Sequence, residues 1–227
     1  ASRTSRSAVE IKPPGNIHII AYGATFKRPD SSPGGFIKNF SSTTNYPGYT
    51  GPSNIKMSGG IWDSNQLPEN PCSGAVVIFF NHCTDITMED VTVLNTGSAH
   101  AVEFNAVSTG RIFNCRFLGF NPITEDRQTS EAVQLDGAFF ASTASGLPYD
   151  NYTCNDIVIQ GCKFDVNPGI LGGFGKAIGS HTPVNNKFHQ NIRIRDNHFA
   201  ACTFYAVGAL SWRQAVISGN IFDRCNG

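Results

Sequence analysis

A short pattern of residues that face the same way returns seven times along the chain, at positions i, i+2, i+5 and i+7. Its clearest copies are Ile157/Ile159/Cys162/Phe164 and Ile192/Ile194/Asn197/Phe199. Alternation at i and i+2 is typical of a β-strand, and the jump of three to i+5 indicates that the chain turns a corner before a second strand begins. Each copy therefore predicts two short strands joined by a bend.

The spacing of these copies predicts how the bent pairs assemble. The last two copies begin at Ile192 and Ala215, 23 residues apart, and the other steps are longer. A repeat of this length, with strand periodicity and variable insertions, is typical of a parallel β-solenoid. A leucine-rich repeat would need Leu-rich strands, whereas this chain is rich in Phe, Ile and Val. We therefore predict an all-β chain folded as a right-handed parallel β-helix of about seven coils, in a single domain over residues 1–227.

A third strand can be aligned between the copies by the same logic. The segments 101–105, 132–136, 177–181 and 206–210 superpose, so that Val102, Val133, Ile178 and Val207 stack inward. One residue further along a strand the side chain points to the opposite face. The outward row then contains Glu103, Gln134, Gly179 and Gly208, together with Asn105, Asp136, His181 and Leu210.

Polar residues gather along this outward row. His100 stands just before its strand, and Glu131, Lys176 and Tyr205 take the same place in the following coils. Neighbouring strands lie about 4.8 Å apart, so residues of adjacent coils could contact one sugar ring together, and we expect an elongated glycan as the ligand. The alternative is that an outward strand face is polar simply because it is solvated.

Insertions lengthen the coils at four places and are expected to form loops, where function concentrates more often than in the scaffold. Three of them flank the polar row and would turn it into a cleft. They run from Asp63 to Ser73, from Phe120 to Ser130, from Phe139 to Asn151 and from Asn167 to Gly175.

Composition narrows the classes of partner. Lys plus Arg equals Asp plus Glu at 17 each, so no global field attracts nucleic acid or a membrane. No apolar stretch approaches the roughly 20 residues of a membrane-spanning helix. No Cys and His spacing indicates a zinc site and no glycine loop cradles phosphate, so no metal or cofactor is expected.

The start of the chain and its cysteines bear on location. The sequence opens without an initiator Met or an apolar signal segment, which is consistent with a mature secreted protein. Cys202 and Cys225 lie one repeat step apart and are the candidate disulfide pair. Cys115 and Cys162 occupy the same inward position and favour a buried stack of thiols. The sequence leaves open whether the chain forms a homo-oligomer.

Several of these blocks resemble the small pectate-lyase-like β-helix proteins, which include the secreted hyaluronidases of the Streptomyces type and relatives in phage tails. The similarity covers roughly residues 50–225. It rests on the segments 59–65 (GGIWDSN), 98–103 (SAHAVE), 130–136 (SEAVQLD) and 179–181 (GSH).

The resemblance implies eliminative cleavage of a uronic-acid polysaccharide, most plausibly hyaluronan. Such a lyase must neutralise the uronate carboxylate, remove a proton and protonate the leaving oxygen. His181 or His100 would be the base and Tyr205 the acid. Asn65, Asn105 and Gln134 would bind the carboxylate. The other expected contacts to the anionic chain are Arg127, Glu131, Lys176 and Trp212.

Two other functions remain open. Glu103 and Asp136 would lie about 8 Å apart, within the range of an inverting glycoside hydrolase, although the paired-Asp and Gly-His-Gly blocks of polygalacturonases are absent. The second alternative is a non-catalytic adhesin or tail domain. For that function exposed aromatic residues matter, and of the two tryptophans Trp62 falls on an inward position whereas Trp212 does not.

Overall fold

The computed structural model describes residues 10–29, 34–41, 45–69, 71, 76–139 and 149–226. Within these residues the chain is all-β apart from one short 3-10 helix, η1 (Glu125–Arg127). No helix there is long and apolar enough to cross a membrane. The start of the chain and parts of the insertions at 63–73 and 139–151 lie outside the described residues.

Two sheets make up this part of the chain, and their named strands all pair in parallel. The larger sheet has 12 strands and follows the order β1-β4-β6-β8-β10-β13-β16, with β3, β11, β14, β17 and β18 joined beside this path. Its strands are β1 (Ile17–Ile20), β3 (Ile37–Lys38), β4 (Ile55–Ser58), β6 (Ile78–Glu89), β8 (Val102–Phe113), β10 (Glu131–Asp136), β11 (Asn155–Gln160), β13 (Lys176–Gly179), β14 (His189–Arg195), β16 (Tyr205–Gly208), β17 (Trp212–Arg213) and β18 (Val216–Ser218).

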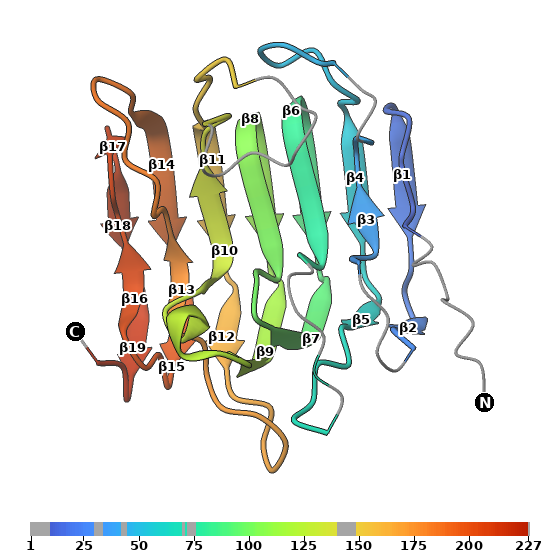
Figure 1. Cartoon of the computed structure of the whole chain (residues 1–227), viewed down its shortest axis with the longest axis vertical. Helices are drawn as coiled ribbons and strands as arrows, with labels where there is room; N and C mark the ends of the chain where they lie inside the picture. The colour runs from blue at the N-terminus through green and yellow to red at the C-terminus, as the bar shows by residue number, and fades with distance from the viewer. Residues whose placement is uncertain are drawn as a thin grey trace.

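The smaller sheet has seven strands in the order β19-β15-β12-β9-β7-β5-β2, which is the reverse of chain order throughout. Figure 1 shows the same progression as a colour gradient, with the blue N-terminal strands at one side and the red C-terminal strands at the other. Its strands are β2 (Thr25–Lys27), β5 (Ile61–Asp63), β7 (Thr92–Gly97), β9 (Arg116–Asn121), β12 (Lys163–Asp165), β15 (His198–Ala200) and β19 (Ile221–Asp223).

The long strands β6 and β8 of the larger sheet each pair with different strands along their first and second halves. The first half of β8 pairs with β10, and its second half pairs with β11. Ala106, between the halves, and Thr109, in the second half, have positive φ angles, a conformation that turns the chain. In β8, the strand that the sequence aligns between two copies therefore continues directly into the first strand of the next copy, as one bent strand.

The repeat register predicted from the sequence is confirmed where strands pair. Ile157 aligns with Ile192, Phe164 aligns with Phe199, and Val133 aligns with both Val102 and Ile178. The inward residues of the inner copies are fully buried, and Phe117, Phe164, Phe199 and Phe222 stack at centroid distances of 4.9, 5.1 and 5.3 Å. The core is therefore a set of side-chain ladders that run along the stack of strands.

The last copy differs because no further described strand covers it. Ile217 is 45% exposed and Phe222 is 55% exposed, although both hold inward positions of the repeat. The first half of β6 was missed by the sequence alignment, and it adds a strand whose Ile78 pairs with Val102.

Of the two predictions about cysteine pairs, one is confirmed and the other is wrong. Cys115 and Cys162 are buried free thiols with their side chains in contact, which confirms the thiol stack. Cys202 and Cys225 also lie side by side, but both are free, so the predicted disulfide is wrong for this structure. One repeat step brings two side chains next to each other without fixing the dihedral angles that an S–S bond needs.

Candidate functional site

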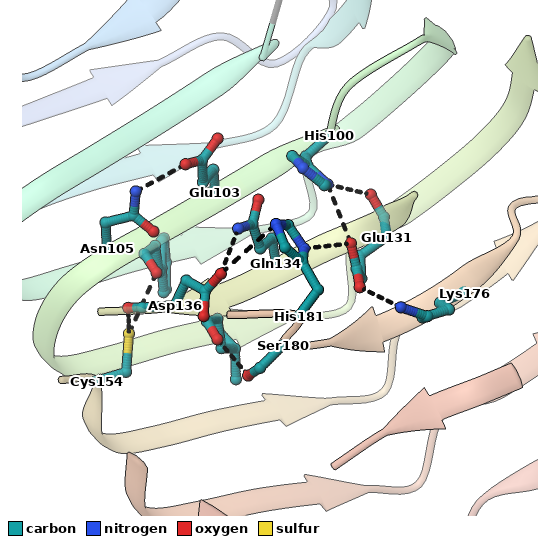
Figure 2. Close-up of polar contacts among 12 residues, drawn as sticks. His100, Glu103, Asn105, Glu131, Gln134, Asp136, Cys154, Lys176, Ser180 and His181 are labelled. Atoms are coloured by element: carbon teal, nitrogen blue, oxygen red, sulfur yellow. Dashed lines mark hydrogen bonds and ion pairs between the residues drawn. The ribbon is translucent and has the colours of Figure 1, made fainter. Parts of the chain in front are cut away.

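The polar row lies where β8, β10 and β13 run side by side. Gln134 aligns with Glu103 and with Gly179, and Asp136 aligns with Asn105. Glu131 aligns with Lys176, which in turn aligns with Tyr205. Figure 2 shows the side chains of this row directed toward one another across the three strands.

Most of this row is buried, contrary to a solvated strand face. Asn105 and Asp136 are fully buried, and Glu103 is only 6% exposed. Asn105 Nδ2 donates to Glu103 Oε1 at 2.7 Å, and Gln134 Nε2 donates to Asp136 Oδ2 at 2.8 Å. Burial raises the pKa of Glu103 to about 8 and also raises the pKa of Asp136.

A second group of residues surrounds the carboxylate of Glu131. Lys176 Nζ donates to Oε1 at 2.8 Å, and the Nδ1 atoms of His181 and His100 lie 3.3 and 3.6 Å from Oε2 (Figure 2). Gly179 leaves room for this arrangement, since a Cβ there would lie 3.2 Å from Glu131 Cγ. Two of these side chains come from β13 and the residues after it, and His100 comes from just before the start of β8.

The protonation states of this group follow from burial and contact. Burial lowers the pKa of His100 to about 4, so its ring is neutral at neutral pH. Burial alone would raise the pKa of Glu131, but hydrogen bonds from His181 and Lys176 outweigh it and hold that pKa at about 2. The same bond to Glu131 raises the pKa of His181.

A pocket of about 220 Å³ opens onto this group. The loop that contains η1 forms its rim, and Arg127, one of the expected ligand contacts, is among the lining residues. The sequence interpretation missed Asp126, Thr129 and Ser130, which line it as well. We call this the histidine pocket, and its lining residues are His100, Asp126, Arg127, Thr129, Ser130, Glu131, Lys176 and His181.

Seven of the predicted site residues do not line this pocket. Four of them lie in the buried part of the row, namely Glu103, Asn105, Gln134 and Asp136, and the other three lie elsewhere. Asn65 follows β5 in the smaller sheet and donates to the carbonyl oxygen of Arg28. Tyr205 is 45% exposed on β16 and does not line the pocket. Trp212 Nε1 donates to Ser180 Oγ at 2.7 Å, so the indole is bound to the residue that precedes His181.

A second pocket, of about 460 Å³, lies at the N-terminal ends of β11, β14 and β17. Three of its ten lining residues are aromatic. Tyr49 and Tyr152 meet edge to face at 5.1 Å, and the guanidinium of Arg213 lies 3.5 Å from the centre of the Phe188 ring. Strand register connects only Gln190 and Arg213 among the lining residues, and the sequence interpretation missed this pocket. We call it the aromatic pocket, and its lining residues are Tyr49, Asp150, Asn151, Tyr152, Thr153, Asn186, Lys187, Phe188, Gln190 and Arg213.

Comparison with known proteins points away from catalysis. No family model matches the sequence. The plasmin and fibronectin-binding protein A of Streptococcus pneumoniae is 27% identical over 190 residues, which are 75% of this chain and 26% of that protein. Two solved structures of PfbA, described as a surface adhesin of Streptococcus pneumoniae, each match 95% of this chain. Their TM-scores are 0.79 and 0.74, at 22% and 20% identity, and 51% and 55% of their chains are covered. The chain thus spans about a quarter of the curated relative and about half of the structures.

These relatives overturn the enzymatic predictions. They are described as an adhesin and as a protein that binds plasmin and fibronectin, so the resemblance to hyaluronidases, the lyase activity and the anionic polysaccharide partner are corrected. Short blocks of similar sequence do not carry an activity with them, because unrelated functions recur on one fold. The catalytic roles given to His181, His100 and Tyr205 presupposed that activity and are not carried further. Of the functions left open by the sequence, the adhesin is the one that these relatives support, and the predicted extracellular location agrees with a surface protein.

Proposed function

We propose that this chain is a protein-binding module of a bacterial surface adhesin. The observation that carries the proposal is the similarity to the plasmin and fibronectin-binding protein over 75% of the chain, joined to a likeness of fold over 95% of it. By this analogy the partners are extracellular host proteins of the plasmin and fibronectin kind.

We further propose that the two parallel sheets are faces of a right-handed β-helix of about seven coils, forming one domain over residues 1–227. Strand orders that follow the chain in both sheets support this architecture, because coils stacked on one axis place each strand beside its counterpart in the next coil. Such a stack presents a long rigid surface, which suits an adhesive function.

The aromatic pocket is the surface that best fits a protein partner. Tyr, Trp and Arg are enriched among the residues that dominate protein–protein binding energy, and Tyr152 and Arg213 are both exposed there. Tyr49 is held in place by its hydroxyl, which donates to the carbonyl oxygen of Thr153 at 2.7 Å. A rigid aromatic wall of this kind loses little conformational entropy when a partner docks.

Binding of the purified chain to immobilised fibronectin and plasmin tests the proposal, with serum albumin as a control surface. Saturable binding to at least one of the two proteins, and none to albumin, is the expected result. Absence of saturable binding to both proteins would contradict the proposed function.

A further inference from the structure

We propose that His100, Glu131 and His181 bind a divalent transition-metal ion, for which Zn²⁺ is the best fit. One ligand atom from each of the three residues lies within 4.8 Å of the others. This site does not depend on the proposed adhesive function, and its residues lie in the histidine pocket rather than in the aromatic pocket.

The distances around Glu131 are close to those of a metal centre. Ligands that each lie about 2.1 Å from a tetrahedral zinc ion are separated by about 3.4 Å from one another. The Nδ1 atoms of His181 and His100 lie 3.3 and 3.6 Å from Glu131 Oε2. An ion beside this oxygen would therefore reach both imidazoles after small side-chain rotations, and His181, at 41% side-chain exposure, has room to make one.

The donor set is the one that such an ion requires. Two imidazoles and one carboxylate, with a further position for water, form the open type of zinc site. An imidazole binds a metal in its neutral form and a carboxylate in its ionised form. An ion would release to solvent the proton that His181 Nδ1 shares with Glu131. The proton that His100 Nδ1 shares with the carbonyl oxygen of Glu131 at 2.9 Å would move to the Nε2 of the same ring, so that Nδ1 is free to bind the ion.

Neighbouring groups would orient these ligands. Asp136 Oδ2 lies 3.8 Å from the second nitrogen of His181, Nε2. A small rotation of the ring would bring this pair to hydrogen-bond distance and give the carboxylate–histidine–metal arrangement that fixes a ligating ring. Lys176 bonds to the other oxygen of Glu131 and so leaves Oε2 for the ion. The pocket of about 220 Å³ admits water and the ion from solvent.

Alkaline-earth ions fit the site less well. Ca²⁺ and Mg²⁺ prefer six or more oxygen ligands, whereas two of the three donors here are imidazole nitrogens. Imidazole suits Zn²⁺ and its neighbours in the first transition row. The site therefore predicts selection of Zn²⁺ or Co²⁺ over Mg²⁺.

Equilibrium dialysis of the untagged chain against Zn²⁺, in the presence of excess Mg²⁺, tests this proposal. We expect about one ion bound per chain, with a Kd in the micromolar range or below, and a higher unfolding temperature when Zn²⁺ is present. Co²⁺ should give visible absorption bands of low-symmetry nitrogen and oxygen coordination. Absence of saturable Zn²⁺ binding by the wild-type chain overturns the proposal.

Two variants show whether the ion lies where we place it. His181→Gln removes a ligand from an exposed position, and binding should weaken by at least about tenfold to a hundredfold. His198→Gln is the matched control on β15 of the smaller sheet and should bind as the wild type does. Unfolding without metal verifies that both variants fold. Equal Zn²⁺ affinity in His181→Gln and the wild type overturns the site, and should His181→Gln fail to fold, His100→Gln replaces it with the same expected loss.

Discussion

Lys176 Nζ lies 2.8 Å from Oε1 of Glu131, and this contact divides the two oxygens of one buried carboxylate between a lysine and a pair of histidines. The lysine neutralises a charge that is 1% exposed. It also places a positive charge beside the position that we assign to a metal ion. The ammonium group of Lys176 would therefore repel an ion bound there.

Replacing Lys176 by Gln should strengthen Zn²⁺ binding. The amide can still donate to Glu131, but the repulsion between the ammonium group and the ion is removed. We expect Kd to fall by about tenfold, equivalent to about 1.4 kcal/mol. Equilibrium dialysis of Lys176→Gln beside the wild type measures the change, and Lys187→Gln is the control because Lys187 lines the other pocket. Unchanged or weaker binding in Lys176→Gln would argue against the metal lying beside Glu131.

Glu103 should make stability fall as pH rises. Its pKa is raised by burial from 4.5 to about 8, so between these values the unfolded chain releases a proton that the folded chain keeps, and the free energy of unfolding decreases. This decrease in the free energy of unfolding is complete above about pH 8. Glu103→Gln, which can still accept the bond from Asn105, should therefore gain stability relative to the wild type, by on the order of a few kcal/mol between pH 5 and pH 8.

Urea unfolding at these two pH values measures that gain. Glu125→Gln, at an exposed position in η1, serves as the matched control and should show no such dependence. A stability difference between Glu103→Gln and the wild type that stays constant with pH would mean that Glu103 is ionised in the folded chain.

Substitutions in the phenylalanine ladder should destabilise the fold more in the middle of the ladder than at its C-terminal end. Phe164 is fully buried between Phe117 and Phe199, so Phe164→Ala should cost about 3–5 kcal/mol of the free energy of unfolding. Phe222 belongs to the same ladder but is 55% exposed, and Phe222→Ala should cost less than about 1 kcal/mol. Chemical denaturation of the two variants provides the comparison, and equal losses would refute the burial gradient.

The aromatic pocket should contribute most of the affinity for a protein partner. Tyr152→Ala and Arg213→Ala each remove an exposed side chain of the kind that forms binding hot spots, and each should raise Kd by about tenfold or more. Tyr22→Ala and Arg224→Ala, at exposed positions outside this pocket, are the matched controls. Binding to immobilised fibronectin and plasmin supplies the measurement, and losses in the controls as large as those in the pocket variants would speak against this surface.

The repeat made the register of the strands predictable from the sequence. Alignment of Val102, Val133 and Ile178 placed Glu103, Gln134 and Asp136 on one face, and the paired strands confirm that register. The alignment did not predict burial of this face, because loop coverage does not follow the period of the strands. It placed His100, Glu131 and His181 on adjoining coils, but it did not predict that both imidazoles lie against one oxygen of Glu131.

The function was harder to predict from the sequence than the fold, because the repeated blocks report on strand structure. Blocks such as SEAVQLD carry the alternating positions that a buried parallel strand needs, so their resemblance to hyaluronidases reflected strand structure rather than activity. The aromatic pocket unites Tyr49, Tyr152 and Arg213 from segments without a common period. Only the three-dimensional structure brings these residues together.

We propose that the aromatic pocket, and not the histidine pocket, faces a protein partner. Hydrogen exchange of the chain, measured with and without saturating fibronectin or plasmin, distinguishes the two surfaces. Exchange should slow at residues 149–153 and 186–190 and stay unchanged at 126–131. Protection confined to 126–131, or no protection anywhere, would contradict this proposal.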